Sequence, residues 1–443
     1  MALRDGQMVL GVFFNHTGHH VASWRHPEAC VDAGVNFKHY VELAQTAERG
    51  KFHFLFFADW LATREATDTT LSRSAQYTAH FEPLTLLGGL AAVTEQIGLI
   101  CTCTTSYNEP FHIARKIASL DHMSGGRMGW NVVTSSFKAE AYNFGREKHF
   151  DHEDRYARAR EFVDVVKGLW DSWDDDAFPR DRESGLYLDP QKKHQLNHEG
   201  ANFKVRGPLN VPRPPQGHPV IVQAGASDTG RELAAATAEV VFTSPLDVAA
   251  GKAFYDDVKG RMAKYGRDPS EMKILPGLNA IVALTDEDAN AKAEYLQSLI
   301  HPEVGREILS MVLEGADLSK CDLDGPLPEL DPMPEGGTPR GVIAMARREN
   351  LTIRQLYLRL AGARGKRSTQ GSVIRVADEM EEWFRAGACD GFILQPAYLP
   401  GSLNDVVELL VPELQRRGLF QTEYEGTTLR EHLGLARPKS RWA

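Results

Sequence analysis

The feature that most constrains this fold is a strict alternation of strand-like and helix-like segments along the chain. The apolar run 8–14, for example, is followed by 37–50, where apolar residues recur at helical spacing. A helix between two strands carries the chain back to the same end of the sheet, so consecutive strands run parallel. The strand-like segments are 8–14, 52–58, 96–105, part of 124–136, 219–224, 239–243, 273–284 and 390–395.

Eight strands are enough to close such a sheet into a barrel. We therefore predict an α/β fold, a (β/α)8 TIM barrel, forming one domain over residues 1–443. Two long segments interrupt the alternation, at about 174–217 and 286–372, and we expect them to be insertions over the C-terminal rim. Barrel enzymes place their active sites at that rim, so strand ends are where candidate residues are sought.

The segment 124–136, with the sequence SGGRMGWNVVTSS, is the most informative part of the chain. Its glycine pair gives the backbone freedom for a tight turn, and Val132 and Val133 suit a packed strand. Ser135 and Ser136 then place hydroxyl groups where the strand ends. The segment is therefore predicted to be the fourth barrel strand, with polar groups at the rim.

Composition and charge exclude several classes of protein. The net charge of −10 gives no indication of binding to nucleic acid or to an anionic membrane. No apolar run is long enough to cross a bilayer, and the N-terminus has no leader pattern. The five scattered cysteines do not suggest a disulfide framework, so we expect a reducing, cytoplasmic location. Cys101 and Cys103 are interpreted as two residues on one face of a buried strand.

A second candidate site follows the fifth strand, in the sequence QAGASDTGR at 223–231. Ser227 or Asp228 can cap the helix that begins there, and the free N–H groups of a helix start can bind phosphate. Ordinary capping is the alternative. The position after a late barrel strand favours phosphate binding, because barrel phosphate sites often occur there.

Other strand and helix ends carry polar residues whose roles stay open on sequence alone. His152 and Tyr156 share one face of a helix start, where they either bind a ligand or complete a structural first turn. Asp59 and Thr104 end the second and third strands, where a carboxylate is either a catalytic base or a loop anchor. The histidines after the first strand, His16, His19 and His20, lack the partners of a metal site, so no metal is predicted.

Together these segments resemble the flavin-dependent monooxygenases of the bacterial-luciferase superfamily. The resemblance is greatest to the branch of nitrilotriacetate monooxygenase component A, pristinamycin synthase and dibenzothiophene-sulfone monooxygenase. It extends over nearly the whole chain. The matching segments are 44–52, 124–135, 152–156, 220–225, 347–352, 411–420 and 422–430.

The resemblance implies a barrel that binds reduced FMN (FMNH2), with roles for individual residues. It implies that His19 and His301 are catalytic and that Phe56 and Phe242 contact the substrate. Which of the three neighbouring histidines lies at the site stays open, because the match around 16–20 is ambiguous by one residue. The implied cofactor-binding residues are Asp59, Thr104, Ser135, Ser136, His152, Tyr156 and Ser227.

The implied activity is that of a two-component monooxygenase. A separate NAD(P)H:flavin reductase would supply FMNH2, since no nicotinamide-binding motif occurs in this chain. Reaction with O2 would give a flavin (hydro)peroxide, linked through C4a or N5, that transfers one oxygen atom to a small organic substrate. The oligomer implied is a homodimer or homotetramer. A deazaflavin-dependent oxidoreductase and a flavin-binding protein without turnover remain the alternatives, and the substrate is left open.

Overall fold

The computed structural model describes residues 5–63, 66–75, 78–331, 333, 337–361 and 367–443. Eight parallel strands close into a barrel, because the sheet order runs from β9 through β11, β1, β2, β3, β4 and β7 to β8, which pairs again with β9. The predicted (β/α)8 barrel is thus confirmed. Its strands are β1 (Val9–Phe13), β2 (Phe54–Phe57), β3 (Gly98–Thr104), β4 (Met128–Val133), β7 (Val220–Gln223), β8 (Val240–Thr243), β9 (Lys273–Ala283) and β11 (Gly391–Leu394).

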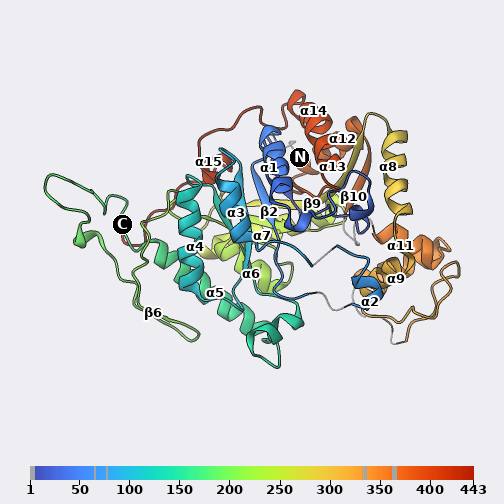
Figure 1. The fold of residues 1–443 in the computed structure, drawn as a ribbon, viewed down its shortest axis with the longest axis horizontal. Helices are drawn as coiled ribbons and strands as arrows, with labels where there is room; N and C mark the ends of the chain where they lie inside the picture. Colours follow the sequence, from blue (N-terminus) through green and yellow to red (C-terminus); the bar gives the residue numbers. More distant parts are fainter. Residues whose placement is uncertain (1–4, 64–65, 76–77, 332, 334–336, 362–366) are drawn as a thin grey trace.

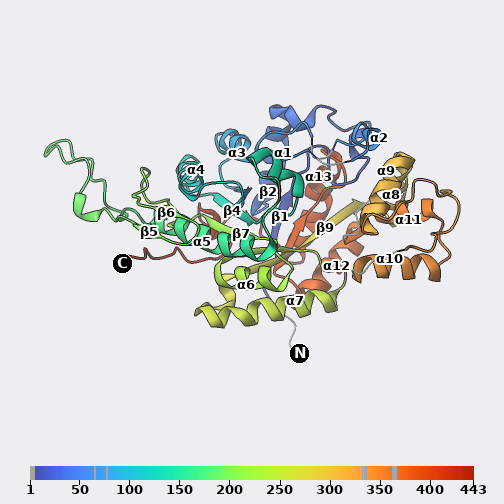
Figure 2. The same cartoon turned by 90° about the horizontal axis from the view of Figure 1, so that it is seen from below.

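Helices surround the barrel, as Figures 1 and 2 show. Each packs an apolar face on the strands; in α1, for example, Tyr40, Leu43 and Ala47 are buried. The surrounding helices are α1 (Phe37–Arg49), α3 (Pro83–Ala91), α4 (Pro110–Met123), α5 (His152–Trp170), α6 (Asp228–Thr237), α7 (Val248–Arg261), α12 (Val373–Arg385), α13 (Gly401–Asp405) and α14 (Val411–Arg416).

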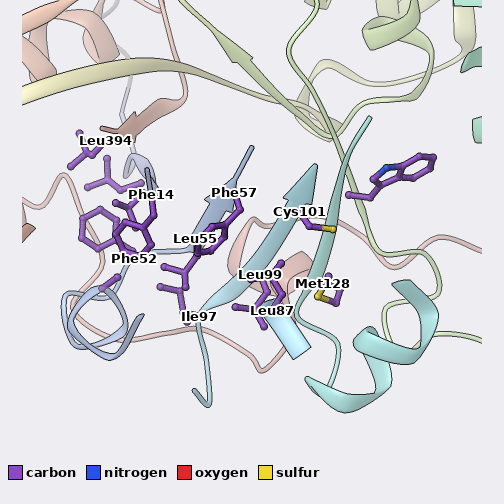
Figure 3. Packing of buried hydrophobic residues seen from close by; sticks show 14 of the residues in the cluster. Phe14, Phe52, Leu55, Phe57, Leu87, Ile97, Leu99, Cys101, Met128 and Leu394 are labelled. Carbon is purple, nitrogen blue, oxygen red and sulfur yellow. The ribbon is translucent and has the colours of Figure 1, made fainter. Parts of the chain in front are cut away.

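The core lies between strands and helices (Figure 3). Trp130 on β4 packs against Phe162 and Trp170 of α5, with ring centroids 5.8 and 6.4 Å apart. Its indole N–H donates to the carbonyl of Cys103 at 3.0 Å, so the ring is buried without an unpaired donor. Cys101 and Cys103 are both buried on β3, as predicted, with sulfur atoms 3.9 Å apart.

Sequence reasoning missed two features of the C-terminal half. Between α13 and α14 the chain forms a π-helical turn at Val406–Leu410, which no sequence pattern indicated. Pro412 explains it, because proline has no N–H to donate to the preceding turn. A ninth strand, β10 (Ser368–Ser372), pairs with the outer half of β9, beyond the barrel. Its polar sequence, STQGS, carries no strand signal.

The two long segments leave the barrel on opposite sides in both views (Figures 1 and 2). The 174–217 segment joins the end of α5 to the start of β7, at the amino ends of the barrel strands, so the expectation that it lies over the C-terminal rim is wrong. It is an extended arm that carries the short pair β5 (His198–Glu199) and β6 (Lys204–Val205). The 286–372 segment has a core of its own, which also takes in Val21 and Ala22 from the loop after β1. Its helices are α8 (Asp286–Ser298), α9 (Pro302–Val312), α10 (Gly337–Arg348) and α11 (Ile353–Ala361).

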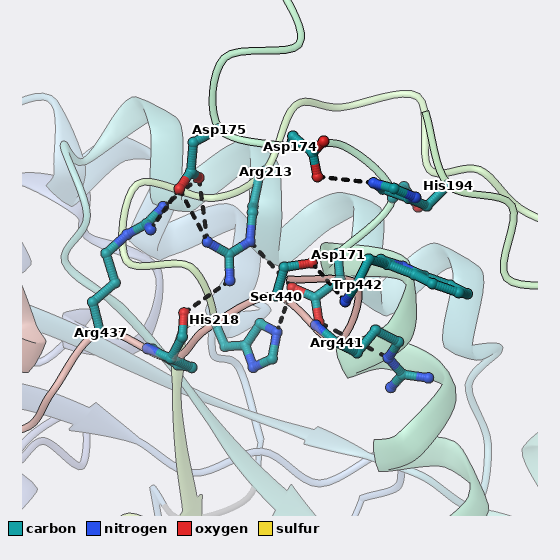
Figure 4. Close-up of polar contacts among 12 residues, drawn as sticks. Asp171, Asp174, Asp175, His194, Arg213, His218, Arg437, Ser440, Arg441 and Trp442 are labelled. Carbon is teal, nitrogen blue, oxygen red and sulfur yellow. Dashed lines mark hydrogen bonds and ion pairs between the residues drawn. The ribbon is translucent and has the colours of Figure 1, made fainter. Parts of the chain in front are cut away.

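A buried charge network fastens the arm and the C-terminal tail to the barrel (Figure 4). Asp171 accepts hydrogen bonds from Arg213 Nε at 3.1 Å, from His218 Nε2 at 2.9 Å and from the Arg441 N–H at 3.2 Å. Trp442 stacks on His194 of the arm, with ring centroids 5.2 Å apart.

Within the described residues, no helix is both long enough and apolar enough to span a bilayer.

Candidate functional site

A cavity of about 300 Å³ opens at the carboxyl ends of the barrel strands. The ends of β1, β2, β3, β4, β7 and β8 contribute residues to it, because the carboxyl ends of parallel strands lie at the same side of the barrel. Its described wall consists of Phe13, Phe56, Ala58, Asp59, Trp60, Leu61, Thr102, Thr104, Asn131, Val132, Val133, Thr134, Ser135, Ser136, Glu140, Tyr156, Gln223, Ala224, Gly225, Leu233 and Phe242.

Three phenylalanines form one apolar side of the cavity. Phe56 stacks on Phe242 with ring centroids 6.0 Å apart, and Phe13 meets both rings edge-on. They come from β2, β8 and β1 and point inward because side chains alternate along a strand. Such a surface excludes water and suits a flat aromatic or apolar group.

Hydroxyl groups form a polar part of the cavity wall. The Thr104 and Ser135 oxygens are in hydrogen-bonding contact, and both side chains are buried. Ser135 has a φ of 51°, a left-handed conformation that turns the chain sharply after β4. Its carbonyl accepts hydrogen bonds from Arg155 and from His149 Nε2, which hold the turn from outside the barrel. Ser135 is thus held at the cavity wall after β4.

Two carboxyl groups also line the cavity. Burial raises the pKa of Asp59 to about 7, and the nearby Glu82 and Glu140 carboxylates add to the shift. Glu140 is 3% exposed; its Oε1 accepts from the Leu61 N–H at 3.2 Å, while no described atom bonds its Oε2. Sequence reasoning missed Glu140, because the stretch around it, FKAEAYNF at 137–144, has no distinguishing pattern. The pair gives the cavity a carboxyl group that can carry a proton at neutral pH.

The start of α6 borders the same cavity. The Ser227 hydroxyl accepts the Gly230 N–H at 3.1 Å and lies 3.5 Å from the Tyr156 hydroxyl. Gly225 sits so close to Gly230 that a Cβ there would lie 2.9 Å from its Cα, so this turn requires glycine. The first N–H groups of a helix have no partner within the helix, so they are available to an anion.

These features fit a flavin mononucleotide. The apolar wall suits the isoalloxazine ring, the Thr104 and Ser135 hydroxyls can bond its polar edge, and the start of α6 suits its phosphate. The unpartnered Oε2 of Glu140 offers an acceptor to a ligand N–H. The donor and acceptor set therefore agrees with the cofactor that the sequence implies.

Most of the site residues predicted from sequence meet at this cavity. His152 is on the exterior, with its ring 4.8 Å from that of Tyr156, and Ser227 caps the adjoining helix. His19 lies behind Phe13, with ring centroids 4.5 Å apart. His301 lines a second cavity and caps α9. The predicted residues on the cavity wall are Phe56, Asp59, Thr104, Ser135, Ser136, Tyr156 and Phe242.

The three neighbouring histidines occupy different surroundings. His19 packs on the cavity residue Phe13 and its Nε2 contacts the Phe13 carbonyl at 2.9 Å. His16 stacks on His80, and burial followed by the charge of His80 lowers the pKa of His16 to about 4. His20 Nδ1 accepts the Ala22 N–H. Among the residues with described positions, no group of three or more His, Cys, Asp or Glu side chains is arranged to hold a metal.

Comparison with known proteins shows the family to which the chain belongs. The model of the luciferase-like monooxygenase family matches residues 15–387. The chain belongs to this family. It is 54% identical to nitrilotriacetate monooxygenase component A of Aminobacter aminovorans, over 98% of each chain. It is 52% identical to N-acetyl-S-(2-succino)cysteine monooxygenase of Bacillus subtilis (strain 168), over 100% of both.

A solved structure supports the cofactor class. A riboflavin lyase crystallised with modified FMN and riboflavin has a TM-score of 0.83 and 30% identity, covering 97% of this chain and 96% of its own. The protein is therefore a flavin-dependent, luciferase-like monooxygenase. These relatives favour the monooxygenase over the two alternatives, a deazaflavin-dependent oxidoreductase and a flavin-binding protein without turnover.

Proposed function

We propose that the chain is the oxygenase component of a two-component system that transfers one oxygen atom from O2 to a small organic polycarboxylate. The observation that carries this proposal is the 54% identity, over 98% of both chains, to a protein named as component A of a monooxygenase. A component A implies a partner component. We assign to that partner, an NAD(P)H:flavin reductase, the supply of FMNH2.

The residues at the barrel mouth take the following roles in this proposal. Phe13, Phe56 and Phe242 hold the reacting groups in an apolar space from which water is excluded. Thr104 and Ser135 orient the flavin ring, and Ser227 with the start of α6 binds its phosphate. The bound reduced flavin supplies the electrons that activate O2.

Proton transfer in this scheme falls to groups at the cavity and next to it. Asp59 can hold or release a proton near neutral pH, because its pKa is raised to about 7. His19 packs on the cavity residue Phe13, and His301 lines a second cavity at the start of α9, so both are assigned supporting roles in this scheme. His152 supports Tyr156 on the cofactor side.

The substrate class rests on the two relatives named above. Nitrilotriacetate and N-acetyl-S-(2-succino)cysteine each carry three carboxylate groups around a nitrogen or sulfur atom. We extend this class to the present protein, acting as a homodimer or homotetramer in the cytoplasm, where NAD(P)H is available to the reductase.

A reconstituted assay tests the proposal. Purified protein is mixed with chemically reduced FMN, O2 and either nitrilotriacetate or N-acetyl-S-(2-succino)cysteine, and products are identified by mass spectrometry. We expect substrate turnover that requires both FMNH2 and O2. Turnover with reduced deazaflavin in the absence of O2 would contradict the proposal, and so would FMNH2 oxidation that yields only hydrogen peroxide with every polycarboxylate offered.

A further inference from the structure

A second cavity, of about 210 Å³, lies beside the barrel mouth. The loop after β1, the chain near α2 (Asp68–Leu71) and the start of the 286–372 segment enclose it. Its described wall consists of Val21, Ala22, Trp24, Arg25, Arg73, Leu299, Ile300, His301 and Val304. Of the residues given a role above, only His301 lies on this wall.

The wall combines apolar surface with two guanidinium groups. Arg25 donates to the Leu299 carbonyl, and Arg73 donates from Nη1 to the Thr69 carbonyl at 2.9 Å and to the Ser72 hydroxyl at 3.1 Å. In the described part of the chain, no carboxylate pairs with either arginine. Each guanidinium has five N–H donors, so both keep donors for a ligand. Two unneutralised cations at one cavity are notable in a chain with a net charge of −10.

His301 and Trp24 fix the shape of the opening. His301 Nδ1 accepts the Glu303 N–H at 3.3 Å as the cap of α9, so Nε2 is the ring atom available to a ligand. The Trp24 indole N–H donates to the Arg73 carbonyl at 3.0 Å, which ties the loop after β1 to the backbone of Arg73. These hydrogen bonds fix the backbone near Arg73 relative to the loop that carries Arg25.

The second cavity is coupled to the first by one short stretch of chain. Phe13 lines the barrel-mouth cavity, and Val21 and Arg25 line the second. Between them, His19 packs on Phe13, and its N–H donates to the Pro396 carbonyl, which ties this loop to the segment after β11. The end of β1 and the loop after it therefore contribute residues to both cavities.

We propose that the Arg25–Arg73 cavity is a carboxylate-binding subsite that selects polycarboxylate substrates. Arginine suits this role because its planar fork matches the two oxygens of a carboxylate. The apolar residues Val21 and Val304 strengthen the attraction by lowering the local dielectric. This inference rests on the proposed function for its substrate, but it can be tested by binding alone.

The test is isothermal titration calorimetry with propane-1,2,3-tricarboxylate, a tricarboxylate with no reacting nitrogen or sulfur, and with its uncharged triamide. We expect the tricarboxylate to bind the full-length protein and the triamide not to bind. Arg73→Gln should weaken binding at least tenfold. The double variant Arg25→Gln/Arg73→Gln should bind the tricarboxylate more weakly than Arg73→Gln alone. Arg115→Gln, on the exposed face of α4, removes the same charge elsewhere and should leave the affinity unchanged.

Arg73→Gln is the decisive variant, because Arg25 also holds the Leu299 carbonyl and its loss can alter the wall. Equal affinity in wild type and Arg73→Gln would overturn the proposal, and so would equal binding of the triamide or no binding of the tricarboxylate. FMNH2 binding is measured in parallel on the same samples. If the wild-type protein does not bind FMNH2, the proposed function is refuted. Tricarboxylate binding that depends on the arginines would in that case still support the subsite.

Discussion

The side-chain oxygens of Thr104 and Ser135 lie 2.8 Å apart, at the carboxyl ends of the neighbouring strands β3 and β4. The contact depends on an uncommon backbone conformation, since Ser135 adopts a φ of 51° without being glycine. Strain of this kind persists where surrounding contacts fix it, and the bonds from His149 and Arg155 to the Ser135 carbonyl do so here. The turn thereby presents hydroxyls to the barrel-mouth cavity.

Substitutions at Ser135 separate the hydroxyl from the backbone strain. Ser135→Ala loses the hydrogen bond and keeps the strained φ, so we expect a loss of about 1 kcal/mol of stability. Ser135→Gly loses the same bond but relieves the strain, and should be about 1 kcal/mol more stable than Ser135→Ala. Urea denaturation of both variants measures the difference. Equal stabilities would show that the conformation of Ser135 carries no strain.

Asp59 should make stability depend on pH. Its pKa in the folded protein is raised to about 7, so the folded state binds this proton more tightly than the unfolded chain does. The resulting stabilisation is complete below the ordinary carboxyl range and is lost as pH rises through 7. Asp59→Asn removes the dependence, so the variant should gain stability relative to wild type between pH 5 and pH 8.

Denaturation at the two pH values checks this expectation, with Asp151→Asn as the matched control. Asp151 is exposed and makes no side-chain cap, so its substitution should give the same difference at both pH values. A stability difference between wild type and Asp59→Asn that does not change with pH would contradict the assignment of a raised pKa to Asp59.

Ser227→Ala should weaken FMNH2 binding. The hydroxyl borders the proposed phosphate position, and a hydrogen bond to a charged group contributes roughly 1.5–3 kcal/mol. Anaerobic fluorescence titration measures the dissociation constant. Thr285→Ala is the control, because Thr285 caps α8 in the same way but away from the cavity. An unchanged dissociation constant for Ser227→Ala, or an equal loss in both variants, would exclude a phosphate role.

Asp171 should be essential to the stability of the region around the arm. Asp171 is 1% exposed, and its neutralisation leaves the buried Arg213 without one charge partner, so Asp171→Asn should cost about 3 kcal/mol. Asp175 pairs with the same arginine but is 56% exposed, so Asp175→Asn should cost no more than about 1 kcal/mol. Thermal denaturation compares the two. Similar losses would show that burial does not set the strength of this network.

The alternation of apolar runs was enough to predict the barrel, because strand and helix periodicity depend on local sequence. The helical spacing over 37–50, for example, agrees with α1 at Phe37–Arg49. β10 and the π-helical turn were missed because a polar strand and a shifted helix register depend on tertiary contacts and on Pro412. Glu140 and Arg25 were missed for a similar reason, since only folding brings them to a cavity wall.

The central claim is that reduced FMN bound at the barrel mouth drives oxygen transfer to a polycarboxylate. A single-turnover experiment tests it most directly: the protein–FMNH2 complex is formed without oxygen, then mixed with O2 and nitrilotriacetate or N-acetyl-S-(2-succino)cysteine, and the product formed per flavin is counted. The account predicts close to one product per bound flavin with at least one of them, and none when O2 is left out. Complete flavin oxidation with no product from either compound, or product formed without O2, would contradict it.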